Sequence, residues 1–184
     1  MRKQLILITG VGDYNRLFTF FAFIWRFFGY QAHVGAFGWS DDASQFENKL
    51  AKLLADVDRC RGKPVYIIGV SAGGTAAVHA LAARPKTIVK VATLCSPLKA
   101  MPDLQNPLLE TSIARLPASF ARLDTAARKK LLSVHASYDD VVDVSLSHAP
   151  DIRTYRLPTR GHGFTIFMGL TVMSFPIRRF FRSE

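Results

Sequence analysis

One short segment constrains the fold of this chain more than any other: an apolar run, a glycine–serine turn and an alanine-rich stretch in direct succession. Residues 65–68 read Val-Tyr-Ile-Ile, a run typical of a strand buried on both faces of a parallel sheet. The turn at residues 69–73 reads Gly-Val-Ser-Ala-Gly, and residues 72–83 have the composition of a helix that stops before Pro85. This order predicts a strand, a tight turn and a helix that packs back on the strand.

The same alternation of apolar runs and helical patterns extends along the rest of the chain. We expect further strands at residues 4–9, 31–37, 88–94, 131–136 and 152–157. Helical periodicity marks residues 16–28, residues 44–57 and the segment from Phe164 onward, which Pro176 interrupts. Strands separated by helices predict an α/β fold, a three-layer α/β/α sandwich with a mostly parallel sheet of about six strands.

Length and composition predict one ordinary globular domain. The chain has 184 residues, of which 49% are hydrophobic, and no repeat or Gly/Ser-rich linker divides residues 1–184. Residues 98–124 are less regular and could form only a small lid or rim. Two cysteines, Cys60 and Cys95, are too few for a disulfide framework. We therefore expect free thiols and a cytoplasmic protein.

The formal net charge of +10 indicates attraction to anions. Because no helix-turn-helix, RNA-binding aromatic motif or zinc finger is present, we expect no specific binding to nucleic acid, but weak association with anionic surfaces remains open. The apolar run at residues 5–8 is too short for a signal peptide. The phenylalanine-rich residues 17–28 are too short for a membrane span, and could be buried against the sheet or face a membrane.

The turn at residues 69–73 predicts a nucleophile. In a strand–turn–helix context, Gly-x-Ser-x-Gly exposes the serine hydroxyl at the end of the sheet and at the N-terminus of a helix. Ser71 is thus the expected nucleophile, and the N–H of Ala72 an expected oxyanion donor. The loop at residues 10–12 supplies the N–H of Val11 as the second expected donor. The alternative is a turn that binds phosphate, although a P-loop lysine is missing.

A serine nucleophile needs a base and an acid to orient that base. Residues 137–142, after the expected fifth strand, contain Asp139 and Asp140, of which Asp139 is preferred because it comes first, and Asp143 is a more distant candidate. His162 lies between two glycines after the expected sixth strand and is the expected base. The remaining histidines fit this role less well: His33, His79, His135 and His148.

These motifs together resemble the α/β-hydrolase superfamily, particularly its small lipase- and esterase-like members. Residues 5–12 resemble its oxyanion segment, with Thr9 in place of the usual histidine, and residues 91–97 resemble a strand end found in many lipases. The resemblance also places the nucleophile on Ser71, the acid on Asp139 and the base on His162. It implies a shortened fold that lacks the first two strands of the full sheet.

The resemblance implies acyl transfer to water, with a small-molecule ester or acyl compound as substrate and no cofactor or metal. Carboxylic esters are favoured over thioesters and amides by analogy with the fold. Two other readings stay open. The chain could be a non-catalytic binding protein with the same fold, or a basic, aromatic-rich protein that acts at membrane surfaces.

Overall fold

The protein contains one parallel sheet of six strands. The computed structural model describes residues 3–12, 14–35, 37–40, 42–60, 62–102 and 104–183. The strand order is β2-β1-β3-β4-β5-β6, and every neighbouring pair is parallel. The strands are β1 (Lys3–Ile8), β2 (Tyr30–Val34), β3 (Val65–Val70), β4 (Ile88–Leu94), β5 (Leu131–His135) and β6 (Arg153–Arg156).

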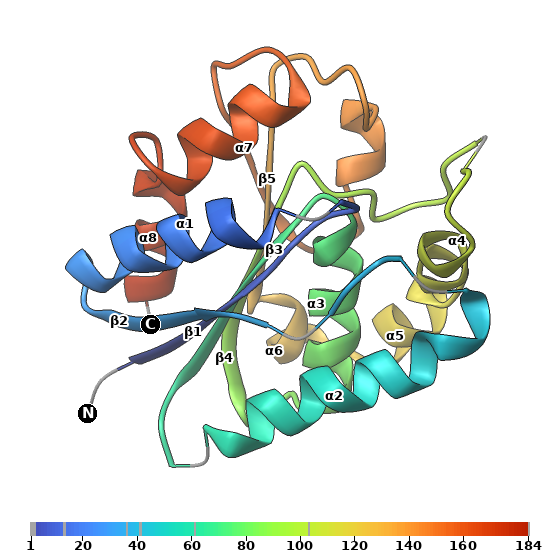
Figure 1. Cartoon of the computed structure of the whole chain (residues 1–184), viewed down its shortest axis with the longest axis horizontal. Helices are drawn as coiled ribbons and strands as arrows, with labels where there is room; N and C mark the ends of the chain where they lie inside the picture. The colour runs from blue at the N-terminus through green and yellow to red at the C-terminus, as the bar shows by residue number, and fades with distance from the viewer. Residues whose placement is uncertain are drawn as a thin grey trace.

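Helices cover both faces of the sheet and make the expected three layers (Figure 1). One face is covered by α1 (Asn15–Phe27), α7 (His162–Leu170) and α8 (Phe175–Arg182). The other face is covered by α2 (Phe46–Arg59), α3 (Ala72–Ala83), α4 (Pro107–Ala114), α5 (Leu116–Arg122) and α6 (Thr125–Arg128). Two short 3₁₀ helices complete the described elements, η1 (Ala43–Gln45) and η2 (Val144–Ser147).

The central strands β1 and β3 contribute alternate side chains to two separate cores, as the period of two along a strand requires. In β1, Leu5 and Leu7 pack against the α1 side of the sheet, whereas Ile6 and Ile8 pack against the α2 side. The two cysteines are buried free thiols in opposite cores. The sheet therefore separates Cys60 from Cys95.

The six predicted strands and the helices predicted at residues 16–28, 44–57 and 72–83 are present, and most of their ends shift by one to three residues. The structure adds α4, α5 and α6, for which the sequence predicted no separate helices. The last helical region divides at residues 171–174 into α7 and α8. Helix α7 begins at His162, whereas the sequence predicted a helix from Phe164. Ala36, within the expected strand at 31–37, and Asp103, within residues 98–124, lie outside the described residues.

The phenylalanine-rich helix α1 has one buried face and one exposed face. Phe18, Phe21 and Trp25 lie on the face that packs against the sheet. The opposite stripe, at helical spacing, holds Phe20, Phe23 and Phe27, which are exposed. Among the described residues no single helix is long and apolar enough to cross a membrane; only the α7–α8 pair, bent by 49°, has the required length and composition.

Candidate active site

Ser71 occupies a strained turn between β3 and α3. Its backbone has φ 53° and ψ −126°, a conformation that non-glycine residues rarely adopt. The Ser71 N–H donates to the carbonyl of Leu94 at 2.8 Å, which attaches the turn to the end of the neighbouring strand β4. Helix α3 begins at the next residue, Ala72. The serine hydroxyl is therefore held at the N-terminus of a helix and at the carboxyl edge of the sheet.

The glycines of the turn are required by close backbone contacts. A Cβ on Gly69 would lie 2.4 Å from the carbonyl oxygen of Gly73, and a Cβ on Gly73 would lie 2.3 Å from the carbonyl oxygen of Ile8. A Cβ on Gly74 would lie 2.1 Å from the Ser96 hydroxyl oxygen. Real Cβ atoms do not approach so closely, so the strand–turn–helix packing itself demands this glycine pattern.

The loop after β1 lies directly beside Ser71. A Cβ on Gly10 would come within 2.8 Å of the Ser71 Cβ. The indole N–H of Trp39 donates to the carbonyl of Thr9 at 2.9 Å, which anchors the start of this loop. Val11 lines the same cavity as Ser71. The two segments expected to supply oxyanion donors therefore meet at the serine.

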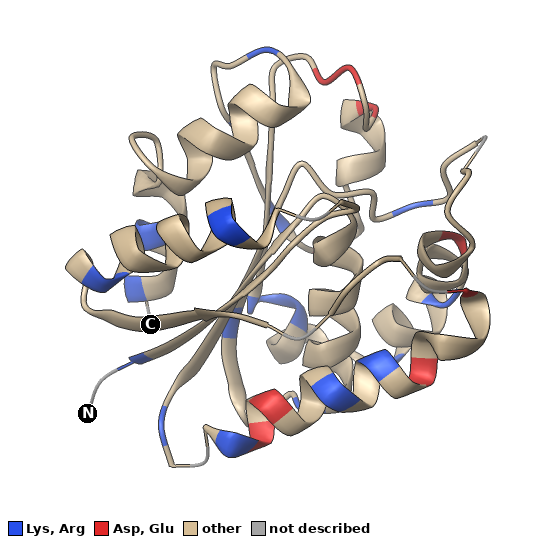
Figure 2. Ribbon diagram, viewed as in Figure 1, with Lys and Arg blue, Asp and Glu red and all other residues tan. Residues whose placement is uncertain are grey.

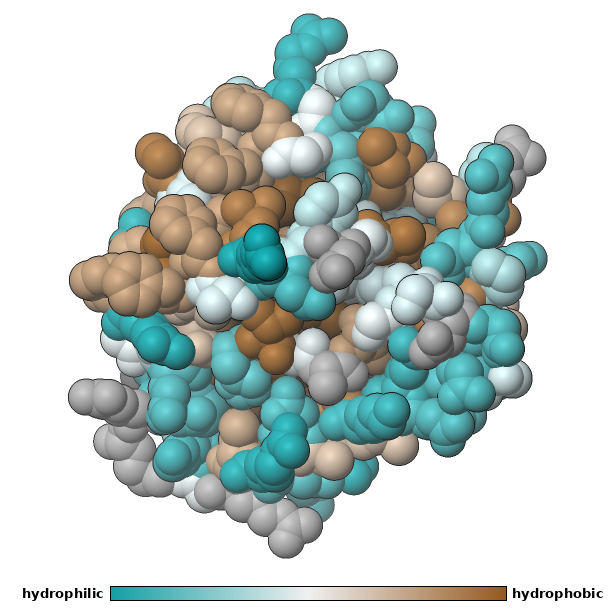
Figure 3. All heavy atoms as spheres, in the orientation of Figure 1, coloured by the Kyte–Doolittle hydropathy of each residue, from teal (hydrophilic) through white to brown (hydrophobic). Residues whose placement is uncertain are grey.

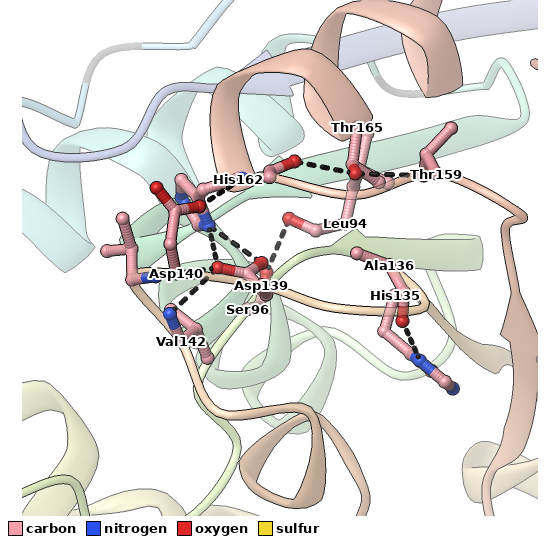
Figure 4. A network of polar contacts seen from close by, with 12 residues as sticks. Leu94, Ser96, His135, Ala136, Asp139, Asp140, Val142, Thr159, His162 and Thr165 are labelled. Atoms are coloured by element: carbon pink, nitrogen blue, oxygen red, sulfur yellow. Dashed lines mark hydrogen bonds and ion pairs between the residues drawn. The ribbon is translucent and has the colours of Figure 1, made fainter.

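His162 and Asp139 form a hydrogen-bonded pair at the ends of the last two strands (Figure 4). The imidazole Nδ1 lies 2.9 Å from Oδ2 and 3.0 Å from Oδ1 of Asp139. Burial by itself would raise the pKa of Asp139, but hydrogen bonds from His162 and from the N–H groups of Val142 and Val141 outweigh it and hold that pKa below its ordinary value. The carboxylate can then only accept, so Nδ1 is a ring nitrogen that carries a proton, and Nε2 is the acceptor when the imidazole is neutral.

The pairing of β5 and β6 continues past both strands and brings these two residues together. Tyr138 forms an isolated parallel bridge with Arg160, and the N–H of Gly161 donates to the carbonyl of Tyr138 at 2.9 Å. The next residues along each segment, Asp139 and His162, consequently meet. Only 2% of the Asp139 side chain and 13% of the His162 side chain are exposed, so little water competes for their contact.

The other two candidate acids have structural partners. Asp140 accepts the backbone N–H of His162 at 2.7 Å and so stabilises the first turn of α7. Asp143 accepts the N–H and hydroxyl of Ser145 at the start of η2. Asp139 is thus the aspartate that contacts the imidazole of His162, and Asp140 accepts a hydrogen bond from the backbone of His162.

Cys95 is a neighbour of this pair that sequence reasoning did not identify. Its Sγ, a carboxylate oxygen of Asp139 and a ring nitrogen of His162 lie within 4.8 Å of one another, a spacing that could hold a metal ion. However, burial and the adjacent Asp139 charge raise the pKa of the Cys95 thiol. A metal ligand must be a thiolate, so this thiol is better suited to contact the carboxylate as a neutral donor. The only sequence signal is its place at the end of β4.

The remaining histidines have partners elsewhere. His33 pairs with Asp56 at 3.1 Å. The ring centroids of His135 and His148 lie 4.7 Å apart, with the two rings tilted by 56°. His79 is buried and lies 2.7 Å from the Ser119 hydroxyl oxygen.

Ser71 and His162 line one cavity of about 640 Å³, a volume typical of small-molecule sites. Helices α1 and α7 form two of its sides, and the segment before α4 forms another. Most of the lining side chains are apolar: Val11, Leu17, Phe18, Val70, Met101, Leu104, Leu109, Val141, Val142 and Ile166. The site can therefore hold a largely apolar molecule against a serine and an imidazole.

Residues 7–176 match the model of the Alpha/beta hydrolase family. The chain belongs to this family, and its six-stranded sandwich is a shortened form of the family fold. No curated protein matches the chain in sequence.

Solved structures similar to this one are also α/β hydrolases. The ydeN gene product from B. subtilis has a TM-score of 0.71 and 16% identity, over 98% of this chain and 100% of that one. A monoacylglycerol lipase from Paleococcus ferrophilus has a TM-score of 0.69 and 11% identity, over 96% and 92% of the two chains. The putative non-heme bromoperoxidase BpoC from Mycobacterium tuberculosis has a TM-score of 0.70 and 14% identity, over 98% and 92%. At these identities the likeness establishes the fold.

Proposed function

We propose that the protein hydrolyses carboxylic esters through an acyl-enzyme on Ser71. The observation that carries this proposal is the buried His162–Asp139 hydrogen bond beside a cavity that Ser71 also lines. Lipases and esterases among the similar folds support the same class of reaction. The site's nucleophile, base and acid support acyl transfer, and the choice of an ester over a thioester or amide rests on analogy with the fold.

In the proposed mechanism, Nε2 of His162 accepts the Ser71 proton while the hydroxyl oxygen attacks the ester carbonyl. Asp139 keeps the proton of the imidazole on Nδ1 and stabilises the imidazolium that forms. The imidazolium then protonates the leaving alcohol. Water, deprotonated by the same imidazole, cleaves the acyl-enzyme and restores the serine.

The negative oxygen of the tetrahedral intermediate needs hydrogen-bond donors. The first N–H groups of a helix have no partner within that helix, so the N–H of Ala72 at the start of α3 suits this role. The N–H of Val11, from the loop that contacts Ser71, is the second proposed donor. We also propose that residues 98–124 act as a rim, since Met101, Leu104 and Leu109 line the cavity.

The apolar lining favours an acyl or alkyl group over a charged one, so the proposed substrate is a small ester with a hydrocarbon chain. The reaction needs no cofactor or metal. We further propose that the chain acts as one cytoplasmic domain without a specific nucleic-acid target.

A fluorophosphonate probe tests the nucleophile directly, because it modifies only activated serines. We expect the native protein to be labelled and Ser71→Ala and His162→Ala to remain unlabelled. Hydrolysis of a chain-length series of p-nitrophenyl esters should follow the same pattern. If His162→Ala were labelled normally while His135→Ala or His148→Ala were not, the proposed base would be wrong. If Ser71→Ala retained near-native hydrolysis, the acyl-enzyme mechanism would be wrong.

A further inference from the structure

The exposed large apolar side chains among the described residues come from two parts of the chain, residues 11–27 and 138–175. None of the described residues between 28 and 137 belongs to this set. The exposed members are Val11, Tyr14, Leu17, Phe20, Phe23, Phe27, Tyr138, Val141, Tyr155, Phe164, Phe167, Val172 and Phe175. In Figure 3 tan and brown atoms accordingly gather over α1 and α7, whereas the α2 side is mostly teal. Monomeric proteins rarely expose such contiguous patches without a partner.

Helices α1 and α7 are joined into one surface. The indole N–H of Trp25 on α1 donates to the carbonyl of Leu170 at the end of α7 at 3.0 Å. The rings of Phe21 on α1 and Phe167 on α7 lie 6.0 Å apart in an edge-to-face contact. The exposed rings on the two helices therefore belong to a single face, here called the aromatic face: Phe20, Phe23, Phe27, Phe164 and Phe167.

The helices that form the aromatic face carry no acidic residue. Residues 14–40 and 152–183, which include α1, α7 and α8, contain no aspartate or glutamate. Their basic residues are all arginines: Arg16, Arg26, Arg153, Arg156, Arg160, Arg178, Arg179 and Arg182. Figure 2 shows blue segments and no red ones on α1 and α8, and neither colour on α7, while the acidic residues lie on other elements. An apolar face whose supporting helices carry arginines and no acidic residue complements an anionic bilayer, which offers hydrocarbon beneath phosphate groups.

The cavity opens next to the aromatic face. Leu17 on α1 and Gly163 on α7 line the cavity, and each is followed within one helical turn by an exposed ring, Phe20 and Phe164 respectively. The two helices that form sides of the cavity are therefore the two that would contact a surface.

We propose that the aromatic face docks the protein on the surface of an anionic lipid bilayer, with the active-site cavity directed toward the membrane. The helices lie on the membrane without spanning it, since α1, α7 and α8 all bury one side against the sheet. One consequence rests on the proposed function: the ester substrate would then be an amphiphile resident in the bilayer.

Vesicle sedimentation with the full chain tests the docking. We expect binding to phosphatidylcholine vesicles containing phosphatidylglycerol, weaker binding to phosphatidylcholine alone, and further weakening in high salt. Phe23→Gln with Phe27→Gln removes two rings that are 53% and 75% exposed and lie outside the cavity. This pair should weaken vesicle binding at least about tenfold, because each inserted ring contributes apolar area.

A matched pair of charge variants tests the direction of docking. Arg26→Gln with Arg179→Gln should weaken binding to anionic vesicles about 30-fold at low salt, at roughly 1 kcal/mol per arginine. Lys52→Gln with Lys86→Gln makes the same charge change at exposed sites away from the aromatic face and should have little effect. Equal weakening by both pairs, or no binding to anionic vesicles, would overturn the proposal.

Two further measurements separate docking from catalysis and from self-association. Ser71→Ala should bind vesicles as the native protein does, whether or not the proposed hydrolysis is correct. The Phe23/Phe27 variant should hydrolyse soluble p-nitrophenyl acetate at the native rate and lose activity only on a vesicle-embedded ester. If light scattering instead showed a dimer that the Phe23/Phe27 variant dissociates, without vesicle binding, the face would be a protein interface.

Discussion

Replacement of Asp139 by asparagine tests whether Asp139 or its neighbour Asp140 orients the His162 imidazole. Oδ1 of Asp139 accepts the backbone N–H groups of Val141 and Val142, both at 2.9 Å. In Asp139→Asn the amide oxygen will occupy this position, because only an acceptor satisfies two donors. The amide NH₂ then takes the place of Oδ2 and faces Nδ1 of His162, which lies 2.9 Å away in the native protein.

Two donors cannot share that contact, so the imidazole must move its proton from Nδ1 to Nε2. Nε2 would then be unable to accept the Ser71 proton, and the imidazolium would also lose its counter-charge. The wrong tautomer costs about 10⁴-fold in turnover in a serine protease, equivalent to about 5 kcal/mol of transition-state stabilisation. We expect a loss of the same order here.

Asp140→Asn is the matched control. Its amide oxygen can still accept the His162 N–H, so α7 keeps its first hydrogen bond and loses only a negative charge near the helix N-terminus. That charge contributes up to about 1 kcal/mol to stability, and kcat/KM should change less than about threefold. The assay is kcat/KM for p-nitrophenyl acetate, with circular dichroism spectra to show that both variants are folded.

The reasoning would be refuted if Asp139→Asn retained activity within tenfold of the native protein while Asp140→Asn was strongly impaired. Mild and equal effects at both positions would instead make Asp143, the third aspartate of this segment, the candidate for the catalytic acid. A folded Asp139→Asn protein that is nearly inactive, beside an active Asp140→Asn protein, is the expected outcome.

Three further predictions concern the nucleophile, the turn and the acid sensitivity of the fold. Ser71→Ala should lose on the order of 10⁶-fold in turnover, measured with p-nitrophenyl esters, while its melting temperature stays close to native. Gly73→Ala should lower stability by about 3 kcal/mol and the melting temperature by about 10 °C, because its Cβ would lie 2.3 Å from a β1 carbonyl oxygen. Gly163→Ala, whose Cβ meets nothing within 4 Å, should be neutral or slightly stabilising. Burial lowers the pKa of His79 to about 4, so the unfolded chain binds more protons below pH 6.5, and stability should fall by about 3 kcal/mol between pH 6.5 and 4. The amide of His79→Gln can still hydrogen-bond to the Ser119 hydroxyl and the Ser112 carbonyl but does not titrate. In urea unfolding experiments, the unfolding free energy of this variant should therefore fall less on acidification than that of the native protein.

Each of these predictions has a clear contrary result. Residual hydrolysis by Ser71→Ala above the level of a heat-inactivated sample would point to another nucleophile. Equal melting temperatures for the Gly73→Ala and Gly163→Ala variants would mean that the helix–strand contact can relax. Parallel pH profiles of unfolding free energy for the native and His79→Gln proteins would exclude His79 as a source of acid sensitivity.

The class of fold and the proposed nucleophile were predictable because their signals are local. The run at residues 65–68, the glycines on either side of Ser71 and the helix after it occupy about 20 consecutive residues. Steric limits on the turn and the period of the helix act within such a stretch. The start of α7 was less predictable, since its first turn is completed by Asp140, 22 positions earlier in the chain.

The sequence by itself determined the alternation of strands and helices, the glycine-lined turn around Ser71 and the order in which Ser71, Asp139 and His162 follow one another. Only the tertiary structure decided which aspartate meets the imidazole, that Cys95 lies beside them, and which rings of α1 remain exposed. Adjacent side chains in a loop point in different directions, and only the pairing of β5 with β6 selects the one that faces His162. Helical spacing likewise separates two aromatic stripes on α1, but the sheet chooses Phe21 and Trp25 for burial, and Phe23 and Phe27 stay in solvent because no other element covers them. These outcomes depend on contacts between segments far apart in the chain, which no local pattern encodes.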